Sequence, residues 1–165
     1  MERRFSLILL LIFFCYFEPL HGRESSSPLI GIGGGYFDAG SNHSGGLFQI
    51  EYRFANELFW LAKPQAILIT SRFRSIFLGL GIGVDLYTTK HLVMTPSFIP
   101  GVYCKGSGKD LGYPLEFRSS LELAYEWCCK ARLSGQFYHI SNASLSKKNP
   151  GANALALIFC IPFKR

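Results

Sequence analysis

From Pro28 onward, apolar residues recur at every second position in successive short runs, and this alternation constrains the fold more than any other feature of the chain. Between Leu115 and Trp127 the odd positions carry mostly leucine and aromatic residues, whereas the even positions include three glutamates and Arg118. Successive side chains of a β-strand point to opposite faces. The segment therefore predicts a strand with one apolar face and one polar face.

Eight runs share this pattern, and turn-forming residues such as those at 40–42, 88–90, 106–112 and 147–151 separate them. An even number of strands of about ten residues, each apolar on one face and polar on the other, is typical of a transmembrane β-barrel. We therefore predict an all-β protein that folds as an eight-stranded antiparallel transmembrane β-barrel. The expected strands are residues 28–37, 46–55, 63–72, 75–87, 91–103, 115–127, 130–141 and 152–163.

Composition weakens the competing architectures. A soluble antiparallel sandwich also alternates, but only 17% of the residues are charged and 48% are apolar, which is too few charges for its solvent face. The glycines at 79, 81 and 83 share the polar face and suit a narrow lumen. Eight strands leave an interior that side chains fill, so a pore is disfavoured. The formal net charge of +6 is not gathered in blocks, so we expect no nucleic-acid partner.

The N-terminal segment has the pattern of an export signal. Arg3 and Arg4 precede an apolar run over residues 5–17, which is too short to span a bilayer as a helix. We expect residues 1–22 to be a signal peptide that is removed, and residues 23–165 to form a single outer-membrane barrel domain. With eight strands both ends lie in the periplasm, so the longer connections near 38–45, 104–114 and 142–151 face outward.

Four cysteines remain after export: Cys104, Cys128, Cys129 and Cys160. Four cysteines allow three complete pairings, and the barrel order makes two simultaneous disulfides awkward. Free thiols and a bridge from Cys128 or Cys129 to Cys160 both remain open. No Cys-x-x-Cys or Cys/His cluster is present, so we expect neither a metal nor a cofactor.

Three polar residues interrupt an otherwise apolar outer face. His139 and Ser141 share the face of Leu133 and Phe137, opposite the polar set that includes Arg132, and Asn153 begins the outward face of the next strand. Polar groups facing lipid are costly, so they need a reason. A serine, a histidine and an amide that orients it form a nucleophile with its base. On the pattern alone, a polar girdle at the barrel rim, with Asn153 capping the loop, is the commoner explanation.

Residues 139–143 read His-Ile-Ser-Asn-Ala, and residues 149–151 read Asn-Pro-Gly. This combination resembles the signature of the lipid A 3-O-deacylase family (PagL type), whose members are eight-stranded outer-membrane barrels. Residues 109–112 and 114–119 are also similar to the family, and the resemblance is densest over residues 109–163.

The resemblance implies a role for each site residue. Ser141 corresponds to the nucleophile, His139 to the general base, and Asn142 to an asparagine linked to the oxyanion hole. Asn153 stands where the family has a glutamate that orients the histidine; an amide can orient the ring but cannot offset the positive charge of imidazolium. Ser144 replaces a glycine of the oxyanion hole and still offers its backbone N–H.

On this basis we expect a serine esterase in the outer membrane of a Gram-negative bacterium. It would remove the ester-linked 3-hydroxyacyl chain at the 3-position of lipid A in lipopolysaccharide. The alternative is a catalytically weak or inactive structural or lipopolysaccharide-binding barrel, which the absence of glutamate at 153 favours. The sequence leaves open whether the barrel forms a homodimer. Basic loop residues either lie near the lipid A phosphates or are ordinary solvated charges: Lys105, Lys109, Lys147 and Lys148.

Overall fold

The computed structural model describes residues 27–38, 44–59 and 61–163. The predicted signal peptide at 1–22 and the predicted turn at 40–42 lie outside the described residues. Nine strands are formed in chain order: β1 (Leu29–Phe37), β2 (Gly45–Arg53), β3 (Ala62–Ser71), β4 (Ile76–Val84), β5 (Leu86–Tyr87), β6 (Leu92–Cys104), β7 (Leu115–Glu126), β8 (Arg132–Ser141) and β9 (Ala152–Pro162). Within those three ranges no helix is long and apolar enough to cross a membrane.

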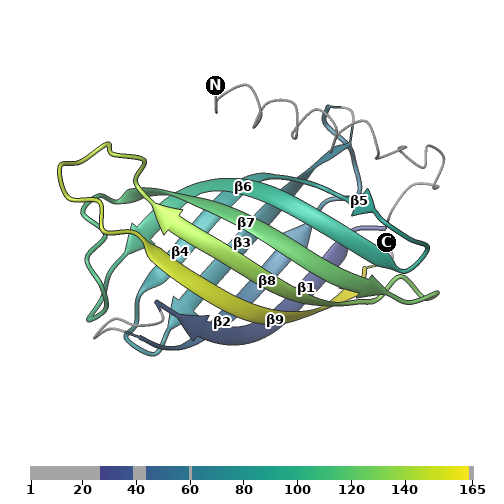
Figure 1. Cartoon of the computed structure of the whole chain (residues 1–165), viewed down its shortest axis with the longest axis horizontal. Coiled ribbons are helices and arrows are strands. Elements are labelled where there is room, and N and C mark those ends of the chain that lie inside the picture. The colour runs from purple at the N-terminus through teal and green to yellow at the C-terminus, as the bar shows by residue number, and fades with distance from the viewer. Residues whose placement is uncertain (1–26, 39–43, 60, 164–165) are drawn as a thin grey trace, which may run out of the picture.

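The strands close into an antiparallel barrel (Figure 1). Each long strand pairs with its chain neighbour, β1 pairs with β9, and β4 pairs with β6 to complete the ring. The short β5 continues β4, because the register against β6 is unchanged on either side of Asp85: Gly83 pairs with Ser97 and Leu86 with Met94. The barrel therefore has eight strands when β4 and β5 are counted together, which confirms the predicted fold class. Each strand overlaps its predicted run, but the run at 75–87 is interrupted at Asp85.

Asp85 lies between β4 and β5 and binds side chains from three other strands. The Asp85 carboxylate accepts a hydrogen bond from Thr95 Oγ1 at 2.8 Å and from Arg132 Nη2 at 3.0 Å, and Lys63 Nζ lies 3.5 Å away. These contacts hold the Asp85 side chain in the lumen, at the position where β4 ends and β5 begins. Alternation alone predicts an unbroken strand over 75–87 and gives no sign of this break.

The period-two pattern also predicts the two faces correctly. The outward-facing residues form an apolar belt, and Leu157 is 67% exposed. The polar set faces inward, and Glu122 is 2% exposed. Leu121, Leu123 and Ile82 are likewise exposed on the outer face, and Arg118 is buried in the lumen.

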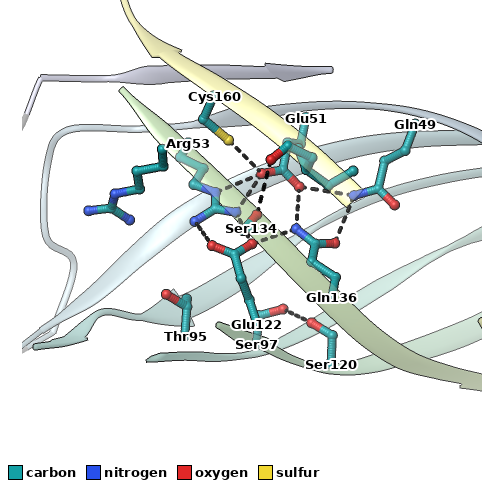
Figure 2. A network of polar contacts seen from close by, with 12 residues as sticks. Gln49, Glu51, Arg53, Thr95, Ser97, Ser120, Glu122, Ser134, Gln136 and Cys160 are labelled. Carbon is teal, nitrogen blue, oxygen red and sulfur yellow. Dashed lines mark hydrogen bonds and ion pairs between the residues drawn. The ribbon is translucent and has the colours of Figure 1, made fainter. Parts of the chain in front are cut away.

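A network of paired charges and amides occupies the lumen (Figure 2). Arg53 from β2 binds Glu51 on its own strand and Glu122 on β7. Gln136 on β8 donates to the same two carboxylates, at 3.0 Å to Glu51 and 2.5 Å to Glu122. Cys160 on β9 contacts Glu51 at 3.4 Å. Because these side chains meet from different walls and satisfy one another, the network ties the barrel together across its interior.

The two ends of the barrel differ. The end of β9 and the turn between β7 and β8 lie at one end, and the connections at 105–114 and 142–151 lie together at the other, on the left of Figure 1. The four cysteines of the described chain are free: Cys104, Cys128 and Cys129 are exposed and Cys160 is buried.

Candidate active site

The predicted base, His139, and the amide predicted to orient it, Asn153, lie opposite each other on the outer surface. His139 on β8 pairs with Asn153 on β9, and both side chains are exposed. The Nδ1 atom of His139 is 2.8 Å from Oδ1 of Asn153. With this oxygen as acceptor, Nδ1 carries the proton and Nε2 remains the basic nitrogen.

Ser141 follows on the same outward face of β8, two positions after His139. Its side chain is half-buried, and its backbone pairs with Phe117 of β7. Within the described chain no hydrogen bond joins the Ser141 hydroxyl to the imidazole. Such contacts are often loose without substrate. The structure thus brings His139 and Asn153 into contact and holds Ser141 next to them.

Gly151 supports the imidazole from the loop side. A Cβ atom at Gly151 would lie 2.6 Å from Cε1 and 2.9 Å from Nε2 of His139, and the Gly151 backbone has φ of +59°. Only glycine combines this left-handed conformation with such a close approach. The backbone of the Asn-Pro-Gly loop therefore packs against the imidazole ring of His139.

Asn142, the residue after Ser141, is fully buried, whereas Ser141 lies on the outer face. Its Nδ2 donates to the carbonyl of Leu111 at 2.9 Å and to that of Lys148 at 2.9 Å. Its backbone N–H donates to Oδ1 of Asn149 at 3.1 Å. Both amide N–H groups are thus used to join the connections 105–114 and 142–151, and neither is directed at a substrate.

The next two residues have an uncommon backbone. Ala143 has φ of 50° and Ser144 has φ of 65°, and the Leu145 N–H closes the turn on the Asn142 carbonyl at 2.9 Å. Among the described residues, no acceptor is bound by the backbone N–H of Ala143 or Ser144. Two unused N–H donors two and three residues after a serine are a suitable source of an oxyanion hole. Ser144 adopts the left-handed backbone conformation that glycine favours. This conformation explains why the family has a glycine at the position of Ser144.

Acidic residues already bind most of the predicted basic loop residues. Asp110 Oδ2 lies 3.1 Å from Lys148 Nζ and 3.5 Å from Lys105 Nζ, and Lys109 Nζ lies 2.8 Å from Asp38. The hydrogen bond from Lys148, together with the one from the backbone N–H of Gly112, lowers the pKa of Asp110. Lys147 makes no ion pair within the described ranges.

No three His, Cys, Asp or Glu side chains in the described chain are grouped so that they could hold a metal ion.

Sequence reasoning named Asn149 and Gly151 only within the Asn-Pro-Gly signature and missed their contacts, and it missed the backbone carbonyl of Leu111 altogether. Their roles depend on how two loops far apart in the chain pack together. A Gly after Pro was a detectable turn signal, but its contact with the imidazole was not detectable.

Comparison with known proteins gives one family. The model of the family described as lipid A 3-O-deacylase (PagL) matches residues 66–162, more than half of the chain. No curated protein matches the chain. Among solved structures, the crystal structure of the outer membrane enzyme PagL is similar with a TM-score of 0.64 and 13% identity, covering 82% of this chain and 99% of that one. A de novo designed transmembrane β-barrel has a TM-score of 0.61 and 9% identity, with 86% and 98% covered. Identities this low show the shared barrel fold alone.

Proposed function

Because the chain belongs to the lipid A 3-O-deacylase (PagL) family, we propose that it is an outer-membrane esterase that hydrolyses the 3-position ester of lipid A. The observation that carries the proposal is the contact of His139 with Asn153 on the outer barrel surface, beside Ser141. A lipid ester within the outer leaflet reaches such a site sideways. An enzyme that acts on a soluble substrate would not need its catalytic groups on an apolar belt.

The chemistry is acyl transfer in two steps. Nε2 of His139 takes the proton of the Ser141 hydroxyl as its oxygen attacks the ester carbonyl. The tetrahedral intermediate collapses with cleavage of the ester C–O bond, and His139 returns the proton to the departing 3-oxygen of the sugar. Water, deprotonated by His139, then attacks the acyl-serine carbonyl, the bond to the Ser141 oxygen breaks, and His139 returns the proton to that oxygen. The products are a 3-hydroxy fatty acid and lipid A with a free 3-hydroxyl.

The loop after the nucleophile supplies the oxyanion donors. The backbone N–H groups of Ala143 and Ser144 bind the developing oxyanion, and Asn142 fixes their position through its two carbonyl contacts. Asn142 thus acts on the oxyanion hole as a positioning residue.

Asn153 orients His139 in place of the family's glutamate. The amide oxygen fixes the tautomer but leaves the imidazolium without a counter-charge, so the enzyme is slower than one that carries a carboxylate.

The membrane placement follows from the belt and the loops. The apolar belt lies in the bilayer and the loops at 105–114 and 142–151 lie at the outer surface, where Lys147 is free to approach a lipid A phosphate.

The second candidate function is a lipopolysaccharide-binding barrel with little or no catalysis. The uncharged Asn153 is the observation that favours it.

Lipid A from Gram-negative cells that express the wild-type chain, the Ser141→Ala variant or neither distinguishes the two. Mass spectrometry should reveal loss of one 3-hydroxyacyl group in the wild-type cells only. Unchanged lipid A in cells with a folded wild-type barrel would contradict the esterase and favour the lipopolysaccharide-binding function.

A further inference from the structure

One buried carboxyl group in the lumen differs from the others. Glu116 on β7 is fully buried, and neither of its oxygens has a hydrogen-bonding partner. The remaining buried carboxylates of the described chain are all in ion pairs: Asp38, Glu51, Asp85, Glu122 and Glu126. Figure 2 shows two of them, Glu51 and Glu122, in the central network. Glu116 has no such cation.

Glu116 lies under the candidate active site. Phe117 pairs with Ser141, so the same register, continued by one residue, sets Glu116 opposite Asn142. The polar groups nearest the Glu116 carboxyl are the backbone N–H of Tyr113 and the side chain of Asn142, and neither is placed to make a hydrogen bond to it. On the adjacent strand β6, Tyr103 is a titratable group whose surroundings include Glu116.

The Asn142 side chain lacks a hydrogen-bond donor for its oxygen. Its Nδ2 is fully used by the carbonyls of Leu111 and Lys148, whereas its Oδ1 is buried without a donor. An ionised Glu116 would place two acceptors against each other in a site that excludes water, which is costly. A protonated carboxyl removes the conflict, because its O–H is the donor that Oδ1 lacks.

We propose that Glu116 is kept as a neutral carboxylic acid that donates its proton to Oδ1 of Asn142, and that it is a positioning residue for the oxyanion loop. The proposal rests on the proposed deacylase function for its kinetic part only. Asn142 directly follows the proposed nucleophile, and its side chain binds the backbone carbonyl of Lys148. Lys148 lies three residues before the glycine that supports His139. Holding Asn142 therefore holds both sides of the site.

The proposal predicts how two substitutions differ. The amide N–H of Glu116→Gln replaces the O–H, so kcat stays within about threefold of wild type. Glu116→Leu leaves Oδ1 without a donor and lowers kcat by about tenfold to about a hundredfold, with KM little changed, because only the placement of the oxyanion donors is lost. Wild-type activity should fall at alkaline pH as the carboxyl ionises, and the Gln variant should keep it.

Two readouts do not depend on activity. The infrared difference spectrum between wild type and Glu116→Gln at neutral pH should contain the carbonyl band of a protonated carboxyl group. Glu122→Gln, the same change in an ion-paired carboxylate, should give no such band. The side-chain amide NMR signal of Asn142 should shift in Glu116→Leu and stay near its position in Glu116→Gln.

Carboxylate bands in place of the carbonyl band would overturn the neutral acid. An equal loss of kcat in the Gln and Leu variants, or the same alkaline fall in wild type and Gln, would overturn the positioning role. A wild-type barrel without activity on lipid A would contradict the proposed function, and the infrared and NMR results would still decide the state of Glu116.

Discussion

The imidazole of His139 lies with Nδ1 2.8 Å from the amide oxygen of Asn153, across the pairing of β8 with β9. The contact has the length of a hydrogen bond that fixes a ring, yet its acceptor carries no charge. An imidazolium formed during catalysis is therefore oriented but not neutralised. This pairing determines how the site should respond when a charge is added or the acceptor is removed.

Asn153→Asp keeps the shape of the side chain and adds a carboxylate, so it should raise kcat, because the charge stabilises imidazolium. A gain of about tenfold is expected, far below the roughly ten-thousandfold effect of the carboxylate in a buried triad, since this site is exposed. Asn153→Glu, the family residue, should act in the same direction, and Asn153→Ala should lower kcat by about tenfold. Steady-state deacylation of lipid A in detergent micelles measures all three. Unchanged activity in Asn153→Ala would remove the orienting role.

The nucleophile and base are tested against a neighbouring serine. Ser141→Ala and His139→Ala should each abolish deacylation, because each removes a group that forms or breaks a bond. Ser119 on β7 is also exposed and pairs with His139, so Ser119→Ala is a matched control that should keep most activity. Heat-modifiable mobility on gels verifies that every variant is a folded barrel. Loss of activity in Ser119→Ala with retention in Ser141→Ala would reassign the nucleophile.

Gly151→Ala should disturb the base without removing it. The added methyl group lies 2.6 Å from Cε1 of His139, and the φ of +59° is strained for alanine. We expect kcat to fall by about tenfold or more. Gly135→Ala is the control on the same strand as His139, because a Cβ at Gly135 meets nothing within 4 Å. Equal activities of the two variants would show that the loop does not position the imidazole.

The lumen network should contribute strongly to barrel stability. Arg53→Met leaves both Glu51 and Glu122 without their cation in a buried place, and loss of one partner of a buried ion pair costs about 3–5 kcal/mol. Lys130→Met removes a half-exposed partner of Glu126 and should cost less than about 1 kcal/mol. Urea unfolding of the two variants in the same detergent or lipid compares them. A similar cost for both would mean that the network adds little to the free energy of unfolding.

The loop contact of Asp110 should be visible as a titration. The backbone N–H of Gly112 donates to Oδ1 of Asp110 at 2.9 Å, so the NMR shift of this amide reports protonation of the carboxyl. Since the hydrogen bond from Lys148 lowers the pKa of Asp110, the midpoint should fall below the ordinary value of 3.8. The contact therefore adds stability above the unfolded pKa, and this is lost as pH falls through the folded pKa. Lys148→Met should return the midpoint toward the ordinary value, and no change would exclude the contact.

The sequence predicted the barrel because every strand obeys the same period of two. It also predicted the outward face shared by His139 and Ser141, since parity along a strand is fixed by geometry. The contacts of Asp85 with Arg132 and Thr95 were not predictable, because they join side chains from different strands.

The surroundings of the site were less accessible from sequence. Residue type gave no sign that the amide of Asn142 is buried between two loops, or that Gly151 packs on His139. Both depend on contacts between segments about thirty residues apart or on backbone conformation, which no pattern of residue types determines.

The central claim is that Ser141 cleaves one ester of lipid A. The direct test incubates the purified wild-type barrel and its Ser141→Ala variant with lipid A in detergent micelles and follows both products by mass spectrometry. The account predicts that the wild type converts lipid A to a species lacking one 3-hydroxyacyl chain, with an equal amount of free 3-hydroxy fatty acid, and that Ser141→Ala yields neither. Intact lipid A after prolonged incubation with the folded wild type, or equal conversion by the variant, would contradict it.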